Sequence, residues 1–158
     1  MARQRLSERI NWYGAYNFTA GQCLVRNNGN CNKEQTAEFL EHLKSWLDES
    51  SPAGKRRIVI WDGAPWHRAH VVRETAKACK LELIPLPGYS PDLNPIEGLW
   101  KWMRENVTQL HCHPSIQALS DACMKFISQI NQDPAAVVNR LWPKFELDPE
   151  IEKLRFSC

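Results

Sequence analysis

The chain has 158 residues, of which 43% are hydrophobic and 24% are charged, and its formal net charge is +2 at pH 7. A chain of this length can bury about 70% of its unfolded surface as one domain, and this composition excludes a disordered protein. Its apolar runs are shorter than the roughly 20 residues of a membrane span, and the basic start MARQRLSERI has no apolar signal segment behind it. We therefore expect a single intracellular domain over residues 1–158, without membrane contact.

The first predicted elements are two strands and a helix. The aromatic-rich stretch INWYGAYNFT at residues 10–19 and the stretch QCLVRN at 22–27 are separated by a short turn, which is typical of a hairpin. Asn32 is a candidate N-cap with Gln35 three residues later, so a helix should follow as far as about Glu49. Its apolar side chains fall on one stripe: Phe39, Leu40, Leu43, Trp46 and Leu47.

The rest of the chain alternates between strands and helices before ending in helices. The run RRIVIWD at 56–62 is typical of a strand buried in a sheet. The following segments are a helix near 68–79, a strand LELIPL at 81–86, and helices at 95–107, 115–131 and 134–141. The inward side of the helix at 115–131 should carry Ile116, Leu119, Cys123, Phe126, Ile127 and Ile130. This order of elements indicates an α/β domain.

The cysteines and basic residues say less about function. The six cysteines include no CxxC pair, so neither a disulfide framework nor a common zinc spacing is present, and we interpret them as reduced thiols. The pI near 8.2 lies below the value of about 9 that is typical of a nucleic-acid-binding domain. Basic residues nevertheless stand beside candidate acids, and they are either solvated surface or phosphate contacts: Arg56, Arg57, Lys101 and Arg104.

The stretch LPGYSPDLNPIEGLW at 86–100 places a stiff proline loop directly before a helix. Pro95 suits the first helical position and Asn94 suits the N-cap. Glu97 then falls where its carboxylate can return to the Asn94 backbone N–H in a capping box. A purely structural interpretation therefore explains all three residues, with a cap worth roughly 1 kcal/mol.

Asp62 ends the predicted buried strand, where ligands collect in open α/β sheets. An Asx turn in DGAP is the alternative interpretation. Together, Asp62 and Glu97 supply two hard oxygen ligands, and magnesium commonly binds one or two carboxylates together with phosphate and water. This pair is therefore a candidate site for phosphoryl transfer.

VIWDGAPWHRAH and LIPLPGYSPDLNPIEGLWKWMREN, with thirty-four residues between Asp62 and Glu97, resemble the catalytic core of the insertion-sequence and mariner-like DDE transposases. The resemblance implies a ribonuclease-H-like mixed sheet with flanking helices, in which Asp62 and Glu97 are the second and third catalytic, metal-binding acids. It also implies that His67 lies beside the site. The residues that would shape the loop presenting Glu97 are Tyr89, Pro91 and Asn94.

The resemblance further implies two-metal chemistry on DNA with Mg²⁺ or Mn²⁺, rather than action on a small-molecule substrate. In such proteins water first frees a 3′-hydroxyl, which then attacks target DNA. The stiff loop would restrict Glu97 so that a metal could bridge it to Asp62.

The family's first acid is not found, because only nine residues precede Ile10 and Glu8 is the one acid among them. We therefore expect the C-terminal portion of a transposase catalytic domain that lacks its central first strand. Metal binding should be weak, with Glu8 and Asp92 as the local candidates for a further ligand.

Two functions remain open: an incomplete nuclease and strand-transfer domain, or a catalytically silent remnant that binds DNA or another chain. The missing strand would leave two apolar strand edges unpaired. We expect a homodimer that covers them, with direct closure of the hairpin onto the Ile58 strand as the monomeric alternative.

Overall fold

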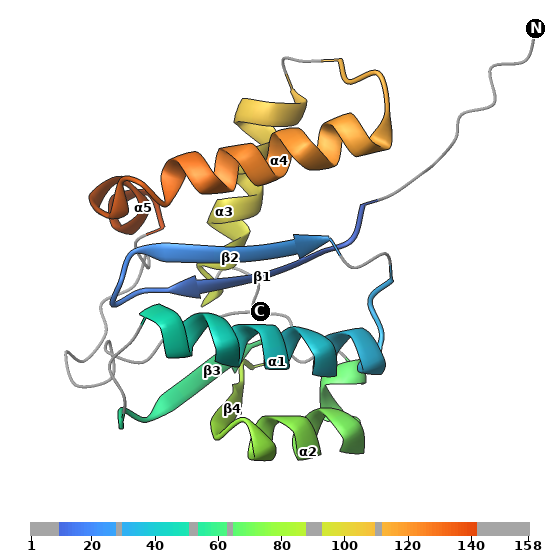
Figure 1. The fold of residues 1–158 in the computed structure, drawn as a ribbon, viewed down its shortest axis with the longest axis vertical. Coiled ribbons are helices and arrows are strands. Elements are labelled where there is room, and N and C mark those ends of the chain that lie inside the picture. The colour runs from blue at the N-terminus through green and yellow to red at the C-terminus, as the bar shows by residue number, and fades with distance from the viewer. Residues whose placement is uncertain are drawn as a thin grey trace, which may run out of the picture.

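The computed structural model describes residues 10–27, 30–50, 54–62, 65–87, 93–109 and 112–141. Every expected helix and strand is present within these ranges, with ends that differ by a few residues from the predicted ones (Figure 1). The strands are β1 (Trp12–Asn17), β2 (Gln22–Asn27), β3 (Arg57–Trp61) and β4 (Leu81–Pro85). The helices are α1 (Lys33–Ser50), η1 (Pro65–Arg68), α2 (His70–Ala78), α3 (Ile96–Met103), η3 (Arg104–Thr108), α4 (Ile116–Ile130) and α5 (Pro134–Arg140). In these ranges no helix is long and apolar enough to cross a membrane.

The strands form two separate pairs. β1 and β2 pair antiparallel, with Tyr13 opposite Arg26, whereas β3 and β4 pair parallel, with Val59 opposite Leu83. Both pairings of a mixed sheet are thus present, but in the described parts of the chain no hydrogen-bonded ladder joins them. The expected alternative, closure of the hairpin onto the Ile58 strand, is therefore not what the described residues adopt.

A glycine makes the hairpin turn possible. Gly21 has a φ of +64° and donates its N–H to the Asn17 carbonyl oxygen at 2.9 Å. A side chain at this position would be strained, and its Cβ would lie 2.7 Å from the Pro134 carbonyl oxygen. The tight turn and the close approach of α5 both require glycine here.

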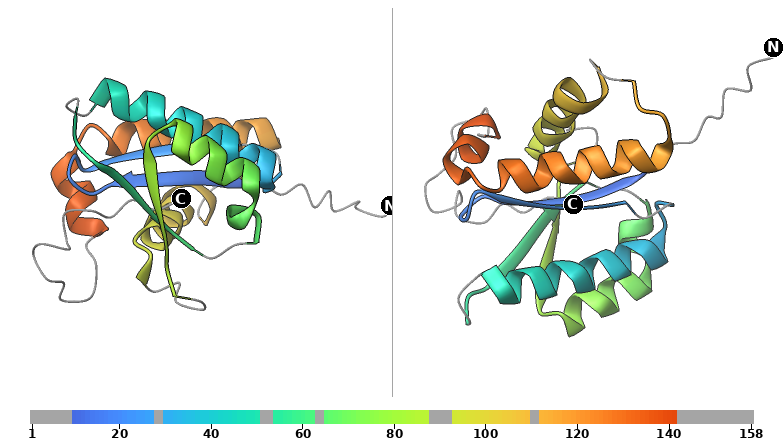
Figure 2. Two further views of the ribbon diagram at one scale, coloured as in Figure 1. Left: turned by 90° about the horizontal axis from the view of Figure 1, so that it is seen from below. Right: turned by 45° about the horizontal axis from the view of Figure 1, so that its top comes forward.

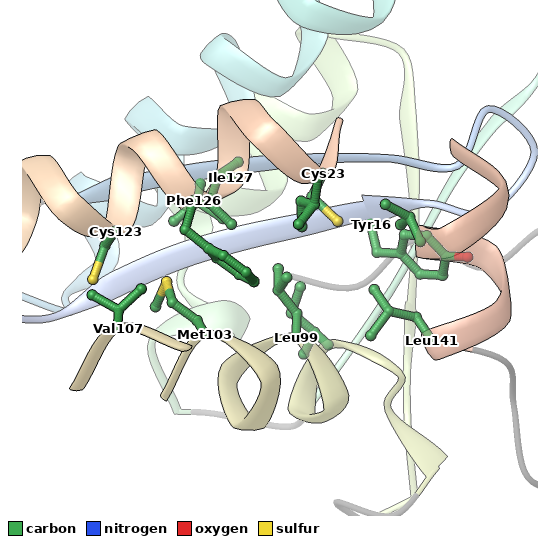
Figure 3. Close-up of a cluster of buried hydrophobic side chains, with 13 residues drawn as sticks. Tyr16, Cys23, Leu99, Met103, Val107, Cys123, Phe126, Ile127 and Leu141 are labelled. Atoms are coloured by element: carbon green, nitrogen blue, oxygen red, sulfur yellow. The ribbon is translucent and has the colours of Figure 1, made fainter. Parts of the chain in front are cut away.

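Helices cover both faces of the hairpin (Figure 2). On one face Tyr13 and Ala15 pack with α1, α2 and strand β3. On the other face Tyr16 and Cys23 pack against α3, α4 and α5, and Figure 3 shows Leu99 in the middle of this second core. Burial on both faces explains why every β1 residue after Trp12 is buried, with no alternation between inside and outside.

Two predicted helix starts are confirmed, one by an asparagine cap and one by a serine cap. Asn32 accepts the Gln35 N–H at 2.8 Å at the start of α1, and Ser115 accepts the Ala118 N–H at 3.1 Å at the start of α4. One predicted inward residue of α4 is wrong, because Ile116 is 38% exposed. It lies in the first turn of α4, and the helical period alone could not show that the core begins further along the helix.

Candidate active site

Asp62 follows the last residue of β3, at the carboxyl end of a parallel strand pair. The ladder continues to this point, since Leu86 donates its N–H to the Trp61 carbonyl oxygen at 2.7 Å. The Asp62 side chain is 62% exposed. A fixed backbone therefore presents an exposed carboxylate at the edge where open α/β sheets bind ligands.

His67 contacts Asp62 twice through one ring nitrogen. Its Nδ1 lies 2.9 Å from the Asp62 carbonyl oxygen and 3.2 Å from the Asp62 carboxylate oxygen Oδ1. Both oxygens accept hydrogen bonds, so Nδ1 carries the hydrogen. The buried imidazole stacks on the Trp61 indole, with ring centroids 4.1 Å apart and planes 10° apart. Burial lowers the pKa of His67, and the Asp62 carbonyl and carboxylate oppose this shift without overcoming it.

α3 begins one residue later than predicted, at Ile96 with Pro95 at the N-cap position, and it carries Glu97 in its first turn as expected. Pro95 has helical angles, φ −59° and ψ −20°, directly before Ile96. Asn94 is buried, and its side-chain oxygen accepts the Ile96 N–H at 3.2 Å while its carbonyl oxygen accepts the Glu97 N–H at 3.1 Å. The cap and the proline together fix the first turn, which carries Glu97.

The charge of Asp62 acts on the Glu97 carboxyl group. Partial burial raises the pKa of Glu97, the negative charge of Asp62 raises it further, and the Arg104 guanidinium lowers it. The effect of Asp62 on Glu97 is the one expected between two like charges, although β3 and α3 belong to different cores. A hard divalent cation fits this donor set, because it binds carboxylate oxygens and offsets their repulsion. Within the described ranges no group of three or more His, Cys, Asp or Glu residues could hold a metal ion.

The predicted basic residues divide into two groups. Arg56 makes two hydrogen bonds of 2.8 and 2.7 Å to Glu82, and Arg57 lies 2.7 Å from Asp48. Both arginines stand at the opposite end of β3 from Asp62 and are engaged by acids, so the structure does not bring them to the site.

Lys101 and Arg104 do lie near Glu97. They follow it by four and seven residues on α3 and at its continuation, so the three side chains share a helical face. Both basic residues are exposed. Of the other predicted site residues, Tyr89 and Pro91 lie outside the described residues, as do Glu8 and Asp92.

Trp61 lies at the site although its sequence pattern did not single it out. It is 3% exposed and forms the surface on which His67 stacks. Its only signal in the sequence is an aromatic residue directly before the candidate Asp62, which is equally typical of a core position.

The sequence of this chain is similar to that of a protein family and of two known proteins. Residues 2–120 match the family described as DDE superfamily endonuclease. The chain is 33% identical over 76 residues to the uncharacterised protein y4pE/y4sA of Sinorhizobium fredii, which covers 48% of this chain and 51% of that protein. It is 27% identical over 96 residues to the transposable element Tcb2 transposase of Caenorhabditis briggsae, covering 60% of this chain and 34% of the transposase. The chain thus spans about half the length of the first relative and a third of the second.

Solved structures agree with the expected fold. The catalytic domain of Mos1 mariner transposase matches with a TM-score of 0.54 and 22% identity, over 78% of this chain and 69% of that one. The same domain solved with Raltegravir and Mg matches with a TM-score of 0.57 and 21% identity, over 78% and 70% of the two chains. The mixed α/β fold is therefore ribonuclease-H-like, as predicted. With a family match over most of its length, this chain belongs to the DDE superfamily endonucleases.

Proposed function

We propose that this chain is a transposase-derived domain for phosphoryl transfer on DNA, in which Asp62 and Glu97 hold a divalent cation, Mg²⁺ or Mn²⁺. The observation that carries the proposal is that a DDE-family chain presents one exposed carboxylate at the end of β3, Asp62, and another in the first turn of α3, Glu97. The rise in the pKa of Glu97 caused by the Asp62 charge supports it. We expect their carboxyl groups to lie within about 4–8 Å, since metals in two-metal sites are about 3.5–4 Å apart.

Each residue has a definite task in this proposal. Asp62 and Glu97 bind the cation, and the Asn94 cap with Pro95 keeps the first turn of α3 in place. Lys101 and Arg104 offer positive charge to the DNA backbone beside the site. A bound divalent ion supplies the polarisation of the scissile phosphate and the acidification of a bound water.

The chain by itself should bind the cation weakly and cleave DNA poorly. Within the described ranges no further His, Cys, Asp or Glu joins Asp62 and Glu97 in a group that could hold a metal ion. Two-metal sites stabilise the transition state by several kcal/mol, and a missing ligand should remove most of this. A catalytically silent protein that acts only by binding DNA or another chain is therefore the second candidate function.

Calorimetric titration with Mn²⁺ tests the site. Asp62→Asn and Glu97→Gln should each weaken binding by about tenfold or more, because each removes a charged oxygen ligand. Asp121→Asn is the matched control, since this exposed aspartate lies on α4 and bonds only locally to Gln117. Equal affinity in all variants would overturn the metal site. Magnesium-dependent nicking of duplex DNA that disappears in Asp62→Ala and Glu97→Ala would show that the chain is active and the silent alternative wrong.

DNA binding has its own test. Lys101→Ala and Arg104→Ala should each weaken binding to duplexes of any sequence and reduce the slope of log K against log salt by about 1. Lys125→Ala, an exposed lysine on α4, is the control. Unchanged slopes for both α3 variants would show that this face does not contact phosphates.

The assembly is the last part of the proposal. β1 is buried from Tyr13 onwards yet hydrogen-bonds as a strand only to β2, and β3 pairs only with β4 among the described residues. Half of the backbone groups in each strand point away from the existing partner, and leaving them buried and unpaired costs about 1–3 kcal/mol each. We therefore propose a homodimer in which a second chain continues the sheet or covers this core.

An obligate interface of this kind should bury more than about 2,000 Å² in total, and the melting temperature should rise with protein concentration. Analytical sedimentation combined with melting curves over a dilution series measures both. A compact monomer at micromolar concentration, with a melting temperature that is independent of dilution, would exclude the dimer.

A further inference from the structure

The contact between His67 and Asp62 has a geometry that fixes a side chain. One ring nitrogen, Nδ1, lies within 3.2 Å of two oxygens of the same residue, the carbonyl oxygen and the carboxylate oxygen Oδ1 of Asp62. An N–H shared between the backbone and the side chain of one residue restricts the rotation that separates them. The Asp62 carboxylate is therefore held in one orientation, although it is 62% exposed.

The imidazole is itself held in place. It stacks on Trp61, with centroids 4.1 Å apart and planes 10° apart, and only 8% of His67 is exposed. Trp61 is 3% exposed and belongs to the core beneath α1, together with Phe39 and Leu43. The orientation of Asp62 is thus set through the imidazole by the packed core of β3 and α1.

We infer that His67 is a positioning residue, whose Nδ1–H holds the Asp62 carboxylate in the orientation in which it binds the proposed cation at the end of β3. The inference rests on the proposed metal site. A ligand that is already oriented loses less conformational freedom when it binds an ion, and partners of this kind typically change metal affinity by 10- to 100-fold.

Two substitutions separate the hydrogen bond from the ring stack. His67→Phe keeps a flat aromatic ring against Trp61 but has no N–H at the Nδ1 position. His67→Asn removes the ring but retains an amide N–H at a similar distance from the backbone. If the stack has only a structural role, His67→Asn should bind metal more weakly than His67→Phe. If the N–H positions Asp62, His67→Phe should bind metal more weakly than His67→Asn.

Mn²⁺ alone is the probe, titrated at one pH into the folded chain and its variants, with melting temperatures measured in parallel. His67→Phe should raise the Kd by about 10-fold or more with little change in melting temperature. His67→Asn should stay within about threefold of the original Kd even though loss of the stack lowers its melting temperature. Equal affinity of His67→Phe and the original chain, or losses that follow melting temperature in both variants, would overturn the inference.

A spectroscopic measurement on the metal-free chain keeps the two proposals apart. The ¹⁵N resonances of His67 should show the hydrogen on Nδ1, which is the less common tautomer of a free imidazole. An Nε2–H tautomer would overturn the positioning role whatever the metal affinity is. Failure of Mn²⁺ to bind the original chain, combined with an Nδ1–H tautomer, would instead reject the metal site and leave the orientation of Asp62 as observed.

Discussion

The hairpin β1–β2 has helices on both faces, whereas the pair β3–β4 has α1 and α2 on one face and leaves Ile84 46% exposed on the other. Their edges differ as well. The outer edge of β2 is closed by Asn131, whose side chain accepts the Cys23 N–H and donates to the Cys23 carbonyl oxygen, both at 2.8 Å. In the described parts of the chain, the second edge of β1 and the second edge of β3 pair with no further strand.

This difference locates the candidate site at a junction. Asp62 extends from the less covered pair, and Glu97 belongs to α3, which packs into the core beside the hairpin through Ile96 and Leu99. The two strand pairs are joined through one core beneath α1, which Tyr13 of the hairpin and Val59 of β3 share. Geometry at the site therefore depends on how the two strand pairs dock.

The largest expected effect on stability comes from a substitution that creates a cavity in a core. Phe39 is fully buried, and the centroid of its ring lies 5.4 Å from that of Tyr13. Phe39→Ala should lower the free energy of unfolding by about 3–5 kcal/mol, and Leu99→Ala, on the other face of the hairpin, should lower it by about 2–5 kcal/mol. If the two halves are one cooperative unit, each variant lowers the same single transition in urea. A separate transition that responds to Phe39→Ala but not to Leu99→Ala would show that the halves unfold independently.

A smaller effect is expected where β1 touches α3. A Cβ on Gly14 would lie 2.5 Å from Cη2 and 2.7 Å from Cζ2 of Trp100, so Gly14→Ala should cost about 1–3 kcal/mol through overpacking. Trp100→Phe removes both of these atoms. The double variant should therefore be more stable than the sum of the two single effects, as measured by chemical unfolding. Strict additivity would mean that this contact does not limit the approach of α3.

The closed edge of β2 gives the next test. Asn131→Asp keeps the shape of the side chain and an acceptor for the Cys23 N–H. It replaces the amide N–H that donates to the Cys23 carbonyl oxygen with a carboxylate oxygen, so two acceptors face each other. We expect a loss of about 1–3 kcal/mol at neutral pH. Asn106→Asp, on an exposed side chain that bonds only to the carbonyl oxygen of Trp102 one turn earlier, serves as the comparison. Equal losses at the two positions would argue against a special role for the closed edge.

The smallest effect concerns pH at the junction. Burial and the Asp62 charge raise the pKa of Glu97 above its ordinary value, so the folded chain holds that proton more tightly than the unfolded chain. This contribution to stability is complete below the unfolded pKa near 4.5 and is lost as pH rises through the higher folded pKa. Glu97→Gln should therefore slightly raise the melting temperature at pH 7 and flatten the decline above pH 4.5. A lower melting temperature at pH 7 would contradict the unfavourable position of the charge.

Local signals in the sequence predicted the elements well. Asn32, Ser115 and the Asn94–Pro95 pair mark helix starts where the structure has them, because a cap is a hydrogen bond within a few residues. The end of α3 was less predictable. The helix expected as far as Val107 changes after Met103 into the π-helical turn η3, and no residue in that stretch is a helix breaker.

The place of Asp62 at the end of a buried strand and that of Glu97 in the first turn of a helix were predictable from the sequence, since periodicity and capping depend on neighbours within about four residues. The sequence could not show that Arg56 and Arg57 form ion pairs with Glu82 and Asp48, at the end of β3 opposite to Asp62. Nor could it show that His67 stacks on Trp61, or that no hydrogen-bonded ladder joins the hairpin to β3 in the described residues. Those features depend on the packing of residues distant in the chain, which only the tertiary structure fixes.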